Sequence, residues 1–147
     1  MRYRWIGATA CALLCLAVAA GAQPESCTLT VHVDGFRNQK GDLGVSIFKA
    51  PEGWPEVNDK AFFHNGFPIT GKESSAQVSL PPGRYALVVL HDENSNHKLD
   101  RNFLGIPKEG FGFSNNPRVN LTAPGFDKAL FDMACPATDL QIHLIYK

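Results

Sequence analysis

Helical periodicity is nearly absent from this sequence, and no internal repeat or low-complexity tract is present. Strand–helix–strand units are absent as well, which argues against the parallel α/β classes. Basic residues bring no excess charge, because 14 Lys and Arg residues balance 14 Asp and Glu residues. Such a balance gives no general attraction for nucleic acid or acidic membranes. The patterns His-Glu-x-x-His and paired Cys-x-x-Cys do not occur, so a catalytic zinc has no support.

The N-terminus is typical of an export signal. Two arginines lie within residues 1–4, residues 5–20 are almost entirely apolar, and the small residues 20–22 suit signal peptidase. We therefore expect residues 1–22 to be cleaved, leaving one domain at residues 23–147 in the periplasm or the extracellular medium. The apolar run is short for a transmembrane helix. A retained anchor is the lesser alternative, and no stable membrane insertion is expected after processing.

Cleavage would remove two of the four cysteines and leave Cys27 and Cys135, near the two ends of the domain. In an oxidising compartment such a pair normally forms a disulfide. Closing so long a loop stabilises the fold by roughly 4–5 kcal/mol in the chain-entropy model. The alternative is a pair of buried free thiols. Arg2 and Arg4 would also leave, so 12 basic and 14 acidic residues remain, a net charge of −2.

Alternation of apolar and polar residues dominates the rest of the chain and predicts extended segments. The first two segments, with the polar turn between them, read as a hairpin. Two antiparallel sheets packed face to face best accommodate this pattern, with about seven strands and one long loop. The strands are expected at residues 28–33, 43–49, 76–80, 84–91, 126–134 and 140–146, with a seventh near residues 118–121.

Residues 51–72 read as irregular, because they contain three prolines and three glycines. One or two helical turns are expected within residues 56–63. The aromatic residues of this segment either cap one end of the sandwich or form an exposed stacking platform for a small ligand or carbohydrate. The platform would consist of Trp54, Phe62 and Phe67.

More than thirty residues with little regular pattern follow the predicted strand 84–91, and loops of that length are usually functional or disordered. The first part of this loop matches part of a calcium-binding template, in which alternate residues point inward and offer hard oxygen ligands. The candidate ligands are Asp92, Asn94, Asn96, the Lys98 carbonyl and Asp100 at template positions 1, 3, 5, 7 and 9.

Two departures from the template leave an alternative open. His97 stands where the sharp turn prefers glycine, and Phe103 stands where an EF-hand has its bidentate glutamate. Either Glu93 or Glu109 could supply the missing carboxylate. Asp and Asn side chains also bond to their own backbone in successive Asx-turns, so the same composition stabilises a metal-free loop. Any calcium affinity is expected to be weak, as in extracellular modules.

Four motifs in and around this loop carry a resemblance that covers about residues 29–146. They are Pro82-Gly83-x-Tyr85-Ala86, His91-Asp92-x-Asn94-x-Asn96-x-x-Leu99-Asp100, Gly105-Ile106-Pro107-x-Glu109-Gly110-Phe111-Gly112-Phe113-Ser114-Asn115-Asn116 and Pro124-x-Phe126-x-x-Ala129-x-Phe131. Together they resemble domain-of-unknown-function family 2141, a family of exported bacterial proteins. The family usually has glycine at the position of His97. The resemblance implies a transthyretin-like or immunoglobulin-like sandwich and brings no established activity or catalytic residues.

These observations favour a non-catalytic binding or structural module whose long loop, at residues 92–116, forms the functional surface. Its partner would be an envelope or extracellular protein or a small ligand. A small-ligand or carbohydrate-binding module is the first alternative, and a hydrolase with an unidentified site is the second. The serine best placed for hydrolysis, Ser114, lacks the second glycine of a nucleophile elbow.

Overall fold

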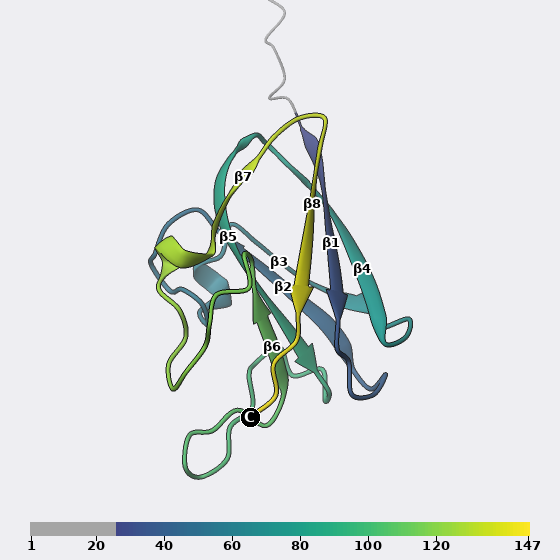
Figure 1. The fold of residues 1–147 in the computed structure, drawn as a ribbon, viewed down its shortest axis with the longest axis vertical. Helices are drawn as coiled ribbons and strands as arrows, with labels where there is room; N and C mark the ends of the chain where they lie inside the picture. The colour runs from purple at the N-terminus through teal and green to yellow at the C-terminus, as the bar shows by residue number, and fades with distance from the viewer. Residues whose placement is uncertain (1–25) are drawn as a thin grey trace, which may run out of the picture.

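The computed structural model describes residues 26–147, which fold into two β-sheets with two short 3-10 turns (Figure 1). The predicted signal at residues 1–22 lies outside the described residues. Within residues 26–147, no helix is long and apolar enough to cross a membrane. The strands of this part of the chain are β1 (Cys27–Asp34), β2 (Asp42–Phe48), β3 (Phe63–Pro68), β4 (Glu73–Leu80), β5 (Gly83–Asp92), β6 (Gly110–Phe113), β7 (Leu130–Met133) and β8 (Ala137–His143).

The all-β sandwich expected from the alternating pattern is confirmed. The smaller sheet has the order β4-β1-β8, in which β1 runs antiparallel to β4 and parallel to β8. The larger sheet has the order β3-β2-β5-β6, and β7 also pairs with β5. All pairings in the larger sheet are antiparallel. The β1–β8 pair is therefore the one parallel pairing within the described residues.

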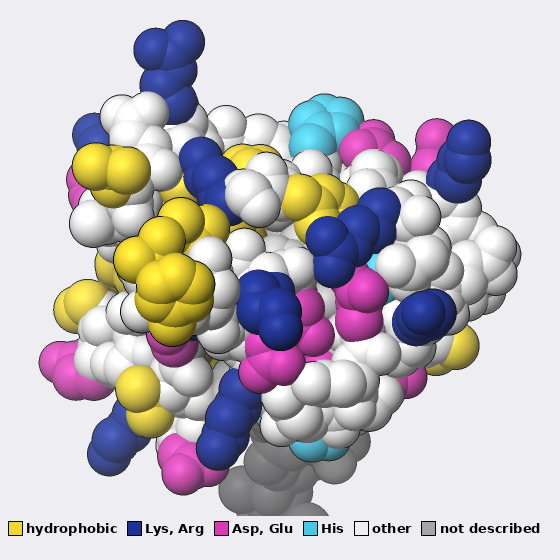
Figure 2. Space-filling model, turned by 90° about the horizontal axis from the view of Figure 1, so that it is seen from below, with side chains coloured by type: hydrophobic (Ala, Val, Ile, Leu, Met, Phe, Trp, Pro, Cys, Tyr) yellow, Lys and Arg dark blue, Asp and Glu magenta, His cyan; other side chains and the backbone are white. Residues whose placement is uncertain are grey.

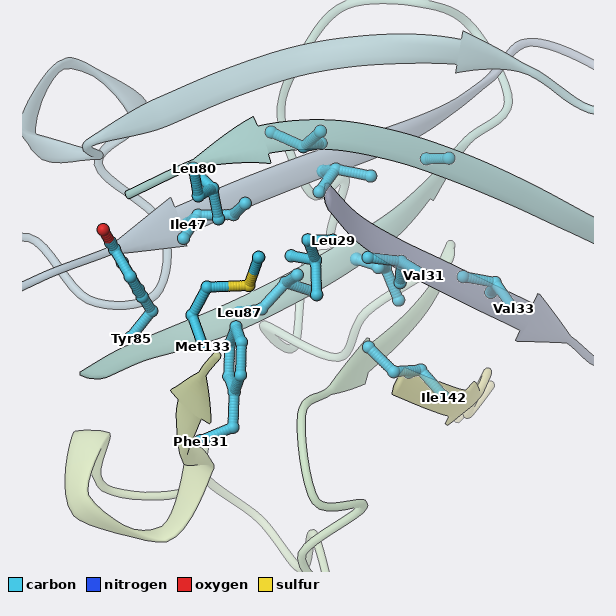
Figure 3. Close-up of a cluster of buried hydrophobic side chains, with 14 of the residues drawn as sticks. Leu29, Val31, Val33, Ile47, Leu80, Tyr85, Leu87, Phe131, Met133 and Ile142 are labelled. Atoms are coloured by element: carbon cyan, nitrogen blue, oxygen red, sulfur yellow. The ribbon is translucent and has the colours of Figure 1, made fainter. Parts of the chain in front are cut away.

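The core lies between the two sheets and follows the period-two pattern of the strands. Alternate residues of β1, namely Leu29, Val31 and Val33, are buried, while their neighbours are exposed or half-buried. Figure 3 shows these side chains meeting others from the larger sheet, such as Ile47 and Leu87. Full burial of an aliphatic side chain of this size contributes about 1.5–3 kcal/mol. The alternation thus sets which face of each strand turns inward.

The predicted hairpin of β1 and β2 is wrong, because the two strands lie in different sheets. In β1, Val31 pairs with Ala76 of β4, whereas in β2, Val45 pairs with Val89 of β5. The connection at residues 35–41 crosses from one sheet to the other. Alternation specifies which face is buried but not which strand is the neighbour. A seven-residue connection without a two-residue turn motif imposes no tight hairpin.

The strand boundaries differ from the prediction in the two regions that read as irregular. Strands β3 and β6 form within segments expected to be loops, and residues 118–121 form no strand. The helical turn expected within residues 56–63 is a single 3-10 turn at Asn58–Lys60. The strand expected at residues 126–134 begins instead as the 3-10 turn Phe126–Ala129 and becomes β7. Its inward residues, Phe131 and Met133, are buried as the alternation requires.

The expected disulfide is present between Cys27 and Cys135, whose Cα atoms lie 5.0 Å apart across 108 residues of sequence. Cys27 is the first residue of β1, and Cys135 lies between β7 and β8. Because β7 belongs to the larger sheet and β8 to the smaller one, the bond fastens the crossover between the sheets to β1.

Strand β6 alternates glycine and phenylalanine for a steric reason. Phe111 and Phe113 lie on the outer face of the larger sheet within a second apolar cluster. Gly112 faces the opposite way, where a Cβ atom would lie 2.7 Å from Ile142 Cγ2 and 2.9 Å from the carbonyl oxygen of His143. The end of β8, which carries Ile142 and His143, therefore passes directly over β6. Only glycine at position 112 leaves room for it.

Candidate functional site

The residues of the predicted calcium loop form a tight turn immediately after β5. Asp92 is 1% exposed, and its two carboxylate oxygens accept hydrogen bonds from the backbone N–H groups of Asn96 at 3.1 Å and His97 at 2.6 Å. His97 has a φ of 62°, in the region that glycine adopts most easily. The turn thus holds a residue other than glycine at its left-handed position.

The other candidate ligands bond to one another and to the backbone. The side-chain amides of Asn94 and Asn96 donate to the two oxygens of Asp100, at 2.8 and 3.0 Å. Their own amide oxygens accept from the backbone N–H groups of Asn96 and Lys98. These Asx-type bonds are those of the metal-free alternative. Calcium binding remains a prediction, and it would require both amides to turn their oxygens toward Asp100.

Glu109, the residue that precedes β6, reaches across the base of this loop. It is 4% exposed, and its carboxylate accepts the backbone N–H groups of Glu93 at 2.9 Å and Asp100 at 3.0 Å. Burial raises the pKa of Glu109 above its ordinary value, and the nearby carboxylates of Asp100 and Asp92 add to this, against the two hydrogen bonds. Glu109 therefore holds the backbone of the loop.

Glu93 turns away from the loop toward the segment between β1 and β2. Its carboxylate accepts hydrogen bonds from the side chains of Arg37 and Asn38. Burial alone would raise the pKa of Glu93, but these two bonds hold it below the ordinary value. His91, at the end of β5, is fully buried and bonds to the Tyr146 hydroxyl at 2.7 Å. Both contacts anchor the loop to the body of the sandwich.

A groove of about 510 Å³ lies on the outer face of the larger sheet, between the sheet and the loop segments 97–107 and 119–123. The sequence did not predict this groove. In β2, Leu43, Val45 and Ile47 face the core, so Gly44 and Ser46 face outward into the groove. The apolar side chains that line it include Val88, Leu90, Leu99, Phe111, Phe113 and Val119.

The floor of the groove is hollow because two glycines face each other there. Gly44 of β2 pairs with Gly66 of β3 on one side and with Leu90 of β5 on the other. A Cβ atom at Gly44 would lie 3.5 Å from Leu90 Cβ, and one at Gly66 would lie 3.6 Å from Asp42 Cβ. Both are ordinary contacts, so neither glycine is required by packing. Glycine within a strand often marks such a hollow, and this was the signal available in the sequence.

One end of the groove is polar. Ser46 Oγ donates to Asn58 Oδ1 at 3.0 Å and lies 2.8 Å from His64 Nδ1. Asn58 Nδ2 in turn donates to the backbone oxygen of His97 at 3.0 Å, which ties the groove to the loop. Burial lowers the pKa of His64, and the neighbouring His97 adds to this effect, while Asp92 opposes it.

Exposed apolar side chains border the groove at its mouth. Leu104, Ile106 and Leu121 line it and are exposed, and Phe103, the neighbour of Leu104 in sequence, is 95% exposed. Figure 2 shows hydrophobic side chains gathered on one part of the face seen from below, with Lys and Arg side chains beside them. Apolar surface of this kind next to a groove is typical of ligand-binding sites.

The aromatic residues proposed as a stacking platform do not lie together. Trp54 packs in the outer cluster between Phe48 and Phe126, and its indole N–H donates to the Pro124 carbonyl at 2.9 Å. Phe67 packs against the core between the sheets. Phe62 remains 46% exposed, with the Lys49 ammonium 4.1 Å from its ring centroid. Trp54 and Phe67 therefore pack in two different apolar clusters, and of the three side chains Phe62 is the exposed one.

Ser114, the serine weighed for a hydrolase, is fully buried. Its hydroxyl accepts the backbone N–H of Leu87 at 2.9 Å and also bonds to the carbonyl oxygens of Leu87 and Ala129. These bonds join the turn after β6 to β5. A serine held in this way is structural and does not reach a substrate.

Comparison with known proteins identifies the family but adds no relative of known structure or activity. No curated protein matches the chain, and no solved structure matches it. One family model matches residues 31–141, described as uncharacterized protein conserved in bacteria (DUF2141). The match covers most of the chain, including both sheets and the long loop, and confirms the resemblance of the four motifs. The chain belongs to the DUF2141 family of bacterial proteins.

Proposed function

We propose that this protein is an exported, non-catalytic binding module whose ligand is a small apolar molecule held in the groove on the larger sheet. The observation that carries the proposal is the groove itself. Its volume of about 510 Å³ falls within the range of small-molecule pockets, about 300–1,000 Å³. Most of the surface that lines it is apolar, with polar and charged side chains among the apolar ones, as in other small-molecule pockets.

The position of the groove agrees with a binding role for the long loop. Loop residues from Lys98 to Pro107 form one wall, and the rigid strands β2 and β5 form the floor. Binding sites are commonly made by loops that a rigid scaffold holds in place. The disulfide between Cys27 and Cys135 supports export, because such bonds persist in oxidising compartments.

The absence of catalytic machinery is part of the proposal and rests on the chemistry of particular residues. Ser114 is buried in backbone hydrogen bonds. The carboxylate of Asp92 is bonded to two backbone N–H groups. Neither is free to act as a nucleophile or a general base.

Dye binding tests the proposal directly. N-phenyl-1-naphthylamine is uncharged and becomes fluorescent in apolar surroundings, so titration into residues 23–147 should give a saturable rise in fluorescence. Gly44→Val should abolish this rise, because its Cβ atom fits beside Leu90 at 3.5 Å and its methyl groups fill the hollow floor. The fold should persist, since valine favours strands.

Gly71→Val provides the matched control, because it lies outside the groove and its Cβ atom would meet nothing closer than 3.7 Å. This variant should bind the dye like the unmodified protein. Equal dye binding by Gly44→Val and by the unmodified protein would contradict the proposal, as would the absence of any saturable signal.

A further inference from the structure

The hydrogen bonds at the polar end of the groove have a direction that can be assigned from their partners. The backbone oxygen of His97 can only accept, so the amide nitrogen of Asn58 must face it, at 3.0 Å. The amide oxygen of Asn58 then faces Ser46 Oγ at 3.0 Å. Because an amide oxygen cannot donate, the hydroxyl of Ser46 gives its proton to Asn58.

The proton on His64 follows from this assignment. Ser46 has one hydroxyl proton, and Asn58 takes it, so the 2.8 Å contact with His64 Nδ1 requires Nδ1 to be the donor. A neutral imidazole with its proton on Nδ1 has its lone pair on Nε2. The one hydrogen bond of the His64 ring within the described residues is that of Nδ1, and because His64 is an exposed residue its Nε2 is open to water or to a ligand. The polar end of the groove therefore offers one unpartnered acceptor.

The charges around the groove favour neither an anionic nor a cationic ligand. The ionised residues that line it are equal in number and opposite in sign: Asp42, Glu56 and Asp92 against Lys98, Arg101 and Lys147. Arg101 is paired with Glu56, and the Lys147 ammonium donates to the Val119 carbonyl at 3.1 Å. Burying an unpaired charge beside Val88 and Leu90 would be costly. An uncharged ligand meets this lining without that cost.

We infer that the groove takes an uncharged amphiphile, whose apolar body lies along Val88, Leu90 and Phe113 and whose hydroxyl donates a hydrogen bond to His64 Nε2. This inference rests on the proposed function and names the chemical class of its ligand. Long-chain alcohols and other hydroxyl-ended lipids belong to this class, whereas fatty acids and alkylamines carry a charge at neutral pH.

Three probes of equal chain length separate these chemistries. Isothermal titration of residues 23–147 with 1-octanol, octanoate and octylammonium should give the tightest binding for 1-octanol. His64→Phe keeps an aromatic ring but removes the acceptor, so the affinity for 1-octanol should fall about threefold to tenfold. His32→Phe is the matched control, because His32 lies on β1 of the smaller sheet, outside the groove. The affinity of this variant for 1-octanol should equal that of the unmodified protein.

A spectroscopic measurement checks the acceptor independently of affinity. Nitrogen chemical shifts of the His64 ring should show a neutral imidazole protonated on Nδ1, and 1-octanol should shift Nε2 in particular. A proton on Nε2, tighter binding of either charged probe, or unchanged 1-octanol affinity in His64→Phe would each overturn the inference. The proposed function would survive those results, because it fails only if no apolar probe binds or if Gly44→Val leaves binding intact.

Discussion

Glu109 and Glu93 are joined across the base of the long loop, where Glu109 Oε1 accepts the backbone N–H of Glu93 at 2.9 Å. The other oxygen of Glu109 accepts the N–H of Asp100 at 3.0 Å. A single buried carboxyl group thus fastens two points of the segment between β5 and β6. Because that segment forms one wall of the groove, the shape of the groove depends on this contact.

Replacing Glu109 with glutamine should loosen the loop. Glutamine has one oxygen in place of two, so one buried N–H of Glu93 or Asp100 loses its acceptor. Such a loss costs about 1–3 kcal/mol of unfolding free energy. Urea denaturation measures the change, with the exposed Glu52→Gln as control. Equal stability of both variants would show that the carboxyl group does not hold the loop.

The same variant makes a pH prediction. The pKa of Glu109 is raised above its ordinary value of 4.5 by burial, so between 4.5 and the folded pKa the folded state binds more protons than the unfolded state. The stability that this pKa shift contributes is therefore fully present below pH 4.5 and is lost as the pH rises through the folded pKa. Relative to Glu109→Gln, the unmodified protein should lose stability across that window in urea denaturation at stepped pH. If the unmodified protein instead gained stability relative to Glu109→Gln as the pH rose, the assignment would be contradicted.

The sequence predicted the sandwich because burial in strands follows a period of two, and Leu29, Val31 and Val33 show that period clearly. It could not predict the pairing of β1, because the alternation of apolar and polar residues does not specify which strands lie beside it in the sheet. The groove was not predicted because it is a feature of tertiary structure: Gly44 and Gly66 are 22 positions apart and meet only when β2 and β3 pair. The composition of the loop could be recognised in the sequence. The bonds of Glu109 to the backbone N–H groups of Glu93 and Asp100 could not, because they form only when the chain before β6 folds back against the end of β5.

Ser114 should matter for stability and not for chemistry. In Ser114→Ala, the backbone N–H of Leu87 loses the hydroxyl that it bonds at 2.9 Å, inside a fully buried site. We expect a loss of about 1–3 kcal/mol in urea denaturation. Ser75→Ala, at an exposed position of β4, should change the unfolding free energy by less than about 0.5 kcal/mol. Equal effects of the two substitutions would contradict this role.

Gly112 should tolerate no side chain. Alanine there would place its Cβ atom 2.7 Å from Ile142 Cγ2 and 2.9 Å from a backbone oxygen, so the C-terminal segment would have to shift. Overpacking of this kind costs about 1–3 kcal/mol. Gly66→Ala is the control, because its Cβ atom would meet nothing closer than 3.6 Å. Thermal unfolding that shows equal midpoints for the two variants would rule out the steric explanation.

The metal-free alternative predicts that calcium leaves the loop unchanged at concentrations where extracellular modules bind it, about 10⁻⁴–10⁻³ M. An ion would displace the bonds that Asn94 and Asn96 donate to Asp100, and it would compete with backbone N–H groups for Asp92. Under this alternative, calorimetric titration should give no heat and the thermal midpoint should not rise. A rise in the unmodified protein that Asp92→Asn or Asp100→Asn removes would instead establish the loop as a calcium site.

Acid should weaken the binding of 1-octanol through His64. Burial and the neighbouring His97 lower the pKa of His64 below 6.5, with Asp92 acting in the opposite direction. Well above pH 6.5 the ring is neutral and Nε2 keeps its lone pair, so the affinity should be constant there. As the pH falls through the lowered pKa, protonation removes the acceptor and places a charge beside an apolar wall. The affinity should therefore fall below pH 6.5 in the unmodified protein and stay level in His64→Phe. Calorimetric titration at stepped pH measures both, and an equal decline in the two proteins would assign the effect to another group.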